Sequence, residues 1–329
     1  QQILDVLPKE AAGVLYYDMQ GMVDVLFENM SVGFAPPEES MDQLEAYQAL
    51  GMAISLSNEG VAIDFVANFD PERLLDQDIA FEENANRILE RIPADALGFM
   101  SSQNLDAGWK RLWDSFAENP DFKQQIDDLG DSLGLALDEE LFSWATGEYA
   151  LTIVESSAVD EFSLPLGVYF ISEVSDQEKA EEMVDSVASF LEMLFFVQPE
   201  TETINGVEMQ VIAGPGLSFG YGFPQEHLLI GYGEEALEVG VSQDLEPILG
   251  DEFFQMVQSK LPSRTNGYVY INVENAWQFA YDSMNEYDKE IFDEDVRPYM
   301  EPVVAIGSAS QIPDFQSGST QGTLFIYIP

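Results

Sequence analysis

The sequence predicts an α+β protein built from internally repeated strand-helix-hairpin units. We expect mostly antiparallel sheets with helices packed on one face of each, arranged in two or more lobes. Two observations lead to this prediction. One phrase of the sequence returns twice further along the chain. The chain also has 329 residues, 46% of them hydrophobic, and single hydrophobic cores usually stop growing at about that length.

The repeated phrase begins with Leu-Pro or Ile-Pro and reaches a glycine six positions after its first residue. It reads LPKEAAGVLYYD, then IPADALGFMSSQ, then LPSRTNGYVYIN. An apolar strand, a helix-capping residue and an amphipathic helix are predicted after each glycine. The shared spacing favours internal duplication over coincidence. The three glycines are Gly13, Gly98 and Gly267, and the three capping residues are Asp18, Asn104 and Asn272.

Two apolar runs around a polar turn follow each of these helices, so each unit is predicted as strand, helix, strand, strand. The first unit spans residues 1–91, the second 92–198 and the third 261–329. Residues 199–260 interrupt the pattern with inserted hairpins and short helices. In that insertion, Asn205-Gly206 favours a two-residue hairpin turn. A capping box at Ser175 predicts the start of a further helix.

The chain is strongly acidic, with 61 acidic and 12 basic residues and a formal net charge of -49 at pH 7. Nucleic acid is excluded as a partner, because its binding depends on Lys and Arg neutralising phosphates. Adhesion to an anionic membrane is disfavoured for the same reason. Self-repulsion on this scale calls for counter-ions, which are monovalent salt, divalent cations or a basic partner.

Dense acidic clusters predict cation sites with oxygen ligands, for which calcium is the candidate cofactor. The densest are residues 288–295, 127–131 and 36–45. None follows the spacing of an EF-hand loop, and a solvated acidic face accounts for any one cluster without a metal. The candidate metal ligands are Asp293, Glu294, Asp295, Asp127, Asp128 and Asp131.

A GLSFG segment matches the nucleophile elbow of serine hydrolases and makes Ser218 a candidate nucleophile. The chain has one histidine, His227, and no aspartate lies between the two residues. The flanking sequence predicts strand-turn-strand rather than strand-turn-helix. The sequence has no cysteine, which excludes disulfides and thiol catalysis. We therefore predict no catalytic residues and no enzymatic activity.

One passage, DSLGLALDEELFSWATGEYALTI, resembles the bacterial domain-of-unknown-function family 3352. The resemblance extends over nearly the whole chain and includes the opening Leu-Pro phrase. It implies an extracytoplasmic, often membrane-tethered protein with no assigned reaction. The residues that carry the resemblance are Leu133, Gly134, Asp138, Glu140, Leu141, Trp144, Gly147, Glu148 and Ala150.

These observations predict a non-enzymatic extracytoplasmic protein, secreted or in the cell envelope, that acts as a binding or structural module with a protein partner. The alternative is a self-assembling extracellular subunit, forming fibres or a surface layer, with divalent cations between acidic faces. A serine hydrolase is a distant third. The chain starts with Gln, so a removed signal peptide or anchor is expected, and no run is long enough to span a bilayer. If subunits associate, ILDVL near the start and TLFIYI near the end are the expected strand-pairing segments.

Overall fold

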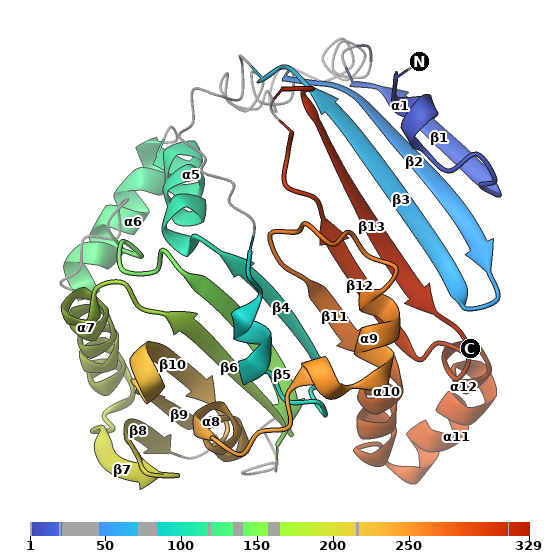
Figure 1. Ribbon diagram of the computed structural model, residues 1–329. Helices are drawn as coiled ribbons and strands as arrows, with labels where there is room; N and C mark the ends of the chain where they lie inside the picture. Colours follow the sequence, from blue (N-terminus) through green and yellow to red (C-terminus); the bar gives the residue numbers. More distant parts are fainter. Residues whose placement is uncertain are drawn as a thin grey trace.

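A computed structural model describes residues 2–19, 21, 46–71, 84–117, 120–133, 141–156, 165–214, 217–314 and 316–329. Its centre is one continuous sheet of 13 strands, in which each neighbouring pair is antiparallel (Figure 1). The prediction of an α+β protein with antiparallel strands is therefore confirmed. The sheet passes through all four predicted segments without a break, and the boundaries between those segments stay a prediction.

Across the sheet the strands follow the order β1-β2-β3-β13-β12-β11-β4-β5-β6-β10-β9-β8-β7. Three triplets of strands that are consecutive in sequence lie side by side: β1 to β3, β4 to β6 and β11 to β13. Each triplet falls within one predicted repeat unit, and the inserted segment adds β7 to β10 at one end of the sheet. The strands are β1 (Gly13–Asp18), β2 (Tyr47–Ser57), β3 (Gly60–Phe69), β4 (Gly98–Gln103), β5 (Glu148–Glu155), β6 (Leu166–Glu173), β7 (Glu200–Ile204), β8 (Val207–Gly214), β9 (Leu217–Gly222), β10 (His227–Tyr232), β11 (Val269–Asn272), β12 (Ala305–Ser310) and β13 (Ser319–Tyr327).

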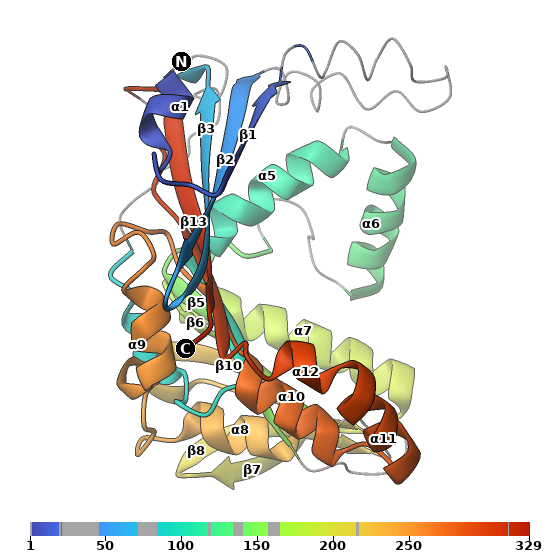
Figure 2. The ribbon, with the colours of Figure 1, turned by 90° about the vertical axis from the view of Figure 1, so that its right-hand side faces the viewer.

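Helices lie on both faces of this sheet, as Figure 2 shows with α1 and α9 on one side and α5, α6 and α10 to α12 on the other. The described helices show no segment long and apolar enough to cross a membrane. The first side carries α1 (Gln2–Val6), η1 (Arg87–Arg91), α8 (Glu234–Val241), η3 (Ile248–Gly250) and α9 (Glu252–Gln258). The second side carries α5 (Leu105–Ala117), α6 (Pro120–Leu133), α7 (Gln177–Phe195), α10 (Val273–Asp282), α11 (Glu286–Asp295) and α12 (Arg297–Met300).

The expectation of helices on one face only was wrong, and adjacent residues of β10 show why. Leu228 and Leu229 are both fully buried, and they point to opposite faces of the sheet. Leu228 packs in the core beneath α7, whereas Leu229 packs in the larger core beneath α8 and α9. A strand that is apolar on both faces needs a covering layer on each face.

The two chain ends also differ from the expectation that they are strand-pairing segments. The ILDVL segment forms helix α1, whose Ile3 packs with Ala53 and Val66 of the sheet. The TLFIYI segment belongs to β13, which pairs with β12 on one side and with β3 on the other. Its backbone donors and acceptors are therefore taken up inside the sheet.

The predicted hairpin turn lies where the sequence indicates, and the predicted cap of helix α7 is displaced by one residue. The hairpin between β7 and β8 turns at Asn205 and Gly206, and both residues have positive φ, as a two-residue primed turn requires. Helix α7 is capped by Asp176, whose side chain accepts from the backbone N–H of Lys179, rather than by the neighbouring Ser175.

The glycines of the repeated phrase sit at or near strand starts, and their surroundings differ. Gly13 is the first residue of β1 and Gly98 the first of β4, while Gly267 lies two residues before β11. A Cβ at Gly13 would meet no atom within 4 Å, and one at Gly98 would lie 2.9 Å from the Tyr270 carbonyl oxygen. At Gly267, which has a φ of +154°, a Cβ would collide with the carbonyl group of Ser101.

We predict a graded cost when these three glycines are replaced by alanine. Gly267→Ala should lower the free energy of unfolding by more than about 2 kcal/mol, because strand β4 would have to move away. Gly13→Ala should change it by less than about 0.5 kcal/mol, since the added methyl meets open space. Urea denaturation of the three variants measures this order, and a similar cost at Gly13 and Gly267 would contradict it.

Candidate binding surface

The strands at the centre of the sheet are apolar on both faces, but the described helices cover them on one face only. In β5, Ala150 and Val154 point to the large core, while Leu151 and Ile153 point to the other face. That second face is continuous with the one that α7 covers further along, since Leu151 is registered with Phe170, which packs beneath α7. The core on the first side is closed, whereas on the second side no described helix lies over β4, β5 and β11, and their side chains there are partly exposed.

Two rows of paired residues form the middle of this open side. Val269, Met100 and Leu151 are directly registered across β11, β4 and β5, with exposed fractions of 43%, 44% and 39%. Ile271 and Ile153 are registered on either side of Gly98 and are 43% and 38% exposed. Aliphatic side chains in a central part of a sheet are usually buried, so this degree of exposure is unusual.

The apolar character continues across the sheet towards β1. We call this whole surface the uncovered face. In sheet order, the strands from β1 to β5 are β1, β2, β3, β13, β12, β11, β4 and β5. Of their described residues that point to the uncovered face, one is charged, Glu155 at the end of β5. Acidic and basic residues make up 22% of the whole chain. Its members include Leu15, Met52, Ile54, Ile63, Leu324, Ile306, Ile271, Val269, Met100, Leu151 and Ile153.

Helices α10 to α12, on the same side of the sheet as the uncovered face, are acidic. The segment from α10 to α12, residues 273–300, has eight acidic and two basic residues. Both basic residues are engaged within the segment. The Arg297 guanidinium lies 4.5 Å from the ring centroid of Tyr281 and 2.9 Å from Asp293, and the Lys289 ammonium lies 5.1 Å from the Tyr281 ring.

The predicted metal ligands fall on two helices of this same side. Asp293, Glu294 and Asp295 are exposed in the last turn of α11, and Asp293 also accepts a hydrogen bond from Tyr281 at 3.2 Å. Asp127 and Asp128 are exposed on α6, where Asp127 lies 3.3 Å from Lys123. Asp131 lies near the end of the same helix. The part of the chain that the structure describes holds no group of three or more potential metal ligands. The cluster at 36–45 lies outside the described residues, and calcium binding stays a prediction.

Ser218 and His227 lie at opposite ends of a strand pair. Ser218 is in β9, where its carbonyl oxygen accepts a hydrogen bond from Gly233 N at 2.8 Å. His227 begins β10, six residues before Gly233, so the two side chains are roughly 20 Å apart along the sheet. The Nδ1 of His227 is 2.8 Å from the Gln225 carbonyl oxygen. The two residues cannot act as a nucleophile and its base in this arrangement.

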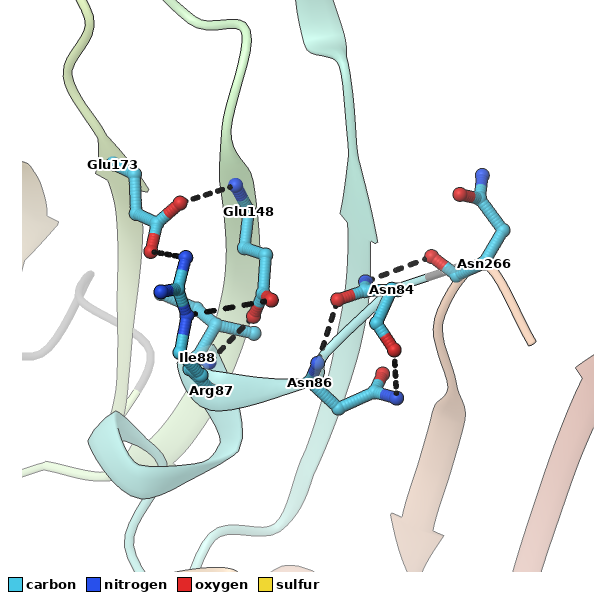
Figure 3. Close-up of polar contacts among 7 residues, drawn as sticks. All are labelled: Asn84, Asn86, Arg87, Ile88, Glu148, Glu173 and Asn266. Atoms are coloured by element: carbon cyan, nitrogen blue, oxygen red, sulfur yellow. Dashed lines mark hydrogen bonds and ion pairs between the residues drawn. The ribbon is translucent and has the colours of Figure 1, made fainter. Parts of the chain in front are cut away.

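A buried carboxylate that the sequence marked only through the family resemblance lies on the first side of the sheet, beneath η1 (Figure 3). Glu148 is 4% exposed, and its Oε2 accepts from the backbone N–H of Ile88 at 2.8 Å. Arg87 Nε lies 3.9 Å from the other carboxylate oxygen of Glu148, and Arg87 Nη2 lies 2.9 Å from Glu173. Glu173 in turn accepts from the backbone N–H of Glu148 at 3.1 Å.

The glycine before Glu148 makes this arrangement possible. A Cβ at Gly147 would lie 2.6 Å from the Cβ of Glu173, so only glycine leaves room for the Glu173 side chain. On the other side of η1, Asn84 donates to the Asn266 carbonyl oxygen at 3.0 Å and accepts from Asn86 N at 2.7 Å (Figure 3). The cluster fastens segment 84–91 to β5, β6 and the start of the third unit, which is a structural role.

Burial shifts the acidity of the carboxylate. Desolvation is the largest effect and raises the pKa of Glu148 above its ordinary value, and the nearby Glu173 carboxylate raises it further. The Ile88 hydrogen bond and the Arg87 charge act in the opposite direction and are outweighed. The folded protein therefore holds the Glu148 proton more tightly than the unfolded chain does.

Comparison with known proteins assigns a family and no activity. The family model described as "Protein of unknown function (DUF3352)" matches residues 1–328. No curated protein and no solved structure matches this chain.

We predict that Glu148→Gln changes how stability depends on pH. Because the pKa of Glu148 is raised, its contribution to stability is full below the ordinary value and is lost as the pH rises through the raised one. Gln keeps an acceptor for Ile88 N–H and has no charge to desolvate. The free energy of unfolding, variant minus wild type, should therefore become more positive between about pH 4 and about pH 7.

The exposed Glu155, at the other end of β5, offers the matched control. Glu155→Gln removes the same charge from the same strand and corrects for the general relief of repulsion. Urea denaturation at each pH gives both differences. If the Glu148→Gln curve runs parallel to the Glu155→Gln curve, desolvation of Glu148 does not influence folding.

Proposed function

We propose that this chain, which belongs to the DUF3352 family of proteins of unknown function, is a non-enzymatic extracytoplasmic binding module. The surface that binds is the uncovered face of the sheet. The observation that supports this proposal is the exposure of about two-fifths of each aliphatic side chain in the Val269, Met100, Leu151 row. The extracytoplasmic location rests on the family resemblance of the sequence.

The position of the exposed side chains favours binding over chance exposure. Single apolar residues on a surface are common, but a continuous apolar patch usually marks an interaction site. Here the exposed residues are direct neighbours across three strands, and the opposite face of the same strands is closed. Covering such a surface stabilises a complex by about 25 cal/mol per Å² of apolar area removed from water.

We predict that Met100→Gln/Leu151→Gln abolishes most of the binding of a polarity-sensitive apolar dye. The two side chains are registered neighbours on the uncovered face, and Gln replaces their apolar surface without adding charge. The matched control is Met193→Gln/Leu249→Gln, whose residues are 60% and 36% exposed elsewhere. Dye fluorescence should fall by more than about threefold for the first variant only. Thermal melting should show that both variants melt near the temperature of the wild type. Equal dye fluorescence of the two variants would contradict the proposal that the uncovered face is the binding surface.

A second candidate, self-assembly with divalent cations, is supported by the edge strand β1. Val14, Leu15, Tyr16 and Tyr17 are each 45–49% exposed. Strand β1 pairs with β2, and among the described residues no strand pairs with its other side. An apolar edge of this kind is a template for a strand of another copy. Cations are needed in this case because two chains of charge -49 repel each other.

For this candidate we predict that millimolar calcium shifts the sedimentation of the protein to larger species, compared with sodium chloride of equal ionic strength. Tyr16→Lys should prevent the shift, because a lysine on an edge strand opposes pairing. Tyr299→Lys changes a tyrosine that is 77% exposed on α12 and should leave the shift in place. A monomer in both salts would remove self-assembly from consideration.

A further inference from the structure

We infer that the occupant of the uncovered face is a basic amphipathic helix of another protein. Its apolar side lies on the central strands, and its Lys and Arg side chains point to the acidic helices α10 to α12. This inference rests on the proposed function, since it names the partner of the same surface. Two independent features of the molecule support it: the charge distribution around the surface, and the way helix α7 packs on the neighbouring strands, where β5, β4 and β11 carry no described helix.

The charge distribution selects a cationic partner. Three glutamates of α11, Glu286, Glu290 and Glu294, recur at four-residue spacing and are exposed. Like charges at this spacing repel one another along a helix. The two basic residues of the α10 to α12 segment, Lys289 and Arg297, already lie against an aromatic ring and an acid. Cations from outside the chain would therefore find uncompensated acidic residues beside an apolar surface.

The same charges disfavour two other occupants of the uncovered face, a lipid surface and a second copy of the chain. An anionic lipid surface would meet the acidic helices before it reached the strands. A second copy of the chain would bring together two molecules of charge -49. A partner with Lys and Arg around an apolar stripe gains from both features at once, since complementary charge also raises the rate of association.

The sheet already shows how a helix fits on this side. Helix α7 packs on the strands next to the uncovered face through Ala180, Val184 and Ala188, which are four residues apart and almost fully buried. Small residues at this spacing let a helix lie close to a sheet. The neighbouring strands β5, β4 and β11 present aliphatic side chains in the same registered rows, without a described helix upon them. Met100 adds a side chain that adapts to different partners.

The experiment uses the full chain and two helical peptides that differ only in charge. One is an 18-residue Leu/Lys amphipathic peptide, and the other replaces each Lys with Glu and keeps the Leu positions. Fluorescence anisotropy of the labelled peptides should show binding of the Leu/Lys peptide and none of the Leu/Glu peptide. Met100→Gln/Leu151→Gln should weaken the binding by about tenfold, and Met193→Gln/Leu249→Gln by less than about twofold.

Charge position is tested with two triple variants of equal charge change. Glu286→Gln/Glu290→Gln/Glu294→Gln should raise the Kd of the Leu/Lys peptide about fivefold. Glu200→Gln/Glu202→Gln/Glu208→Gln, exposed on β7 and β8 at the end of the sheet, should raise it less than about twofold. Equal effects of the two triples would show that the peptide responds to net charge alone, and would overturn the inference.

The remaining outcomes separate this inference from the proposed function. If the Leu/Glu peptide binds as well as the Leu/Lys peptide, and Met100→Gln/Leu151→Gln weakens both, the uncovered face is a binding surface but its partner is not basic. If vesicles of phosphatidylglycerol bind at the same face, the occupant is a lipid surface and the inference fails. If Met100→Gln/Leu151→Gln changes neither peptide nor dye binding, the proposed function fails as well.

Discussion

The short pairing of β11 with β4 holds the two halves of the sheet together. Three registered residue pairs join the two strands, and they connect the half of the sheet that contains both chain ends to the half that contains the insertion. Backbone bonds extend the pairing at each end, from Ser101 N to the Tyr268 carbonyl oxygen at 2.8 Å and from Asn272 N to the Leu97 carbonyl oxygen at 3.0 Å. Gly98 and Gly267 keep the approach open. Without this junction, the chain would form two separate sheets.

The two sides of that junction have opposite characters. On the covered side, Phe99, Tyr270 and Phe254 form a cluster with ring centroids 5.2–5.7 Å apart. Such aromatic pairs contribute about 0.5–1.5 kcal/mol each beyond the burial of their area. On the other side, the same strands present Val269 and Met100 to solvent. The covered side therefore holds the junction together, and the uncovered side is the one on which we propose that a partner binds.

Local signals in the sequence predicted local features well. The phrase glycines mark the starts of β1 and β4, and Asn205-Gly206 marks a hairpin turn. The continuity of the sheet was not predictable, because the pairing of β11 with β4 joins residues far apart in sequence. A signal for the uncovered face was present in ALTIVE of β5, which is apolar at consecutive positions. That pattern predicts a strand covered on both faces. Leu151 is partly exposed instead, and this difference between prediction and structure identifies the uncovered face. Glu148 had no local signal, since its environment comes from η1 and β6.

The acidity of the chain and its apolar face are physically compatible because the strand positions that form this face carry one charged residue, Glu155, while helices such as α11 carry many. A neutral protein with the same surface would associate with itself, since removing the exposed aliphatic rows from water is favourable for any two copies. At a net charge of -49, each copy repels the other over about 8 Å at physiological ionic strength. The repulsion acts on every acidic neighbour and not on a cationic one. For the partner that we propose, the acidic helices would therefore disfavour other copies of the chain at the uncovered face and favour a molecule of opposite charge, and salt concentration would set the balance between the two.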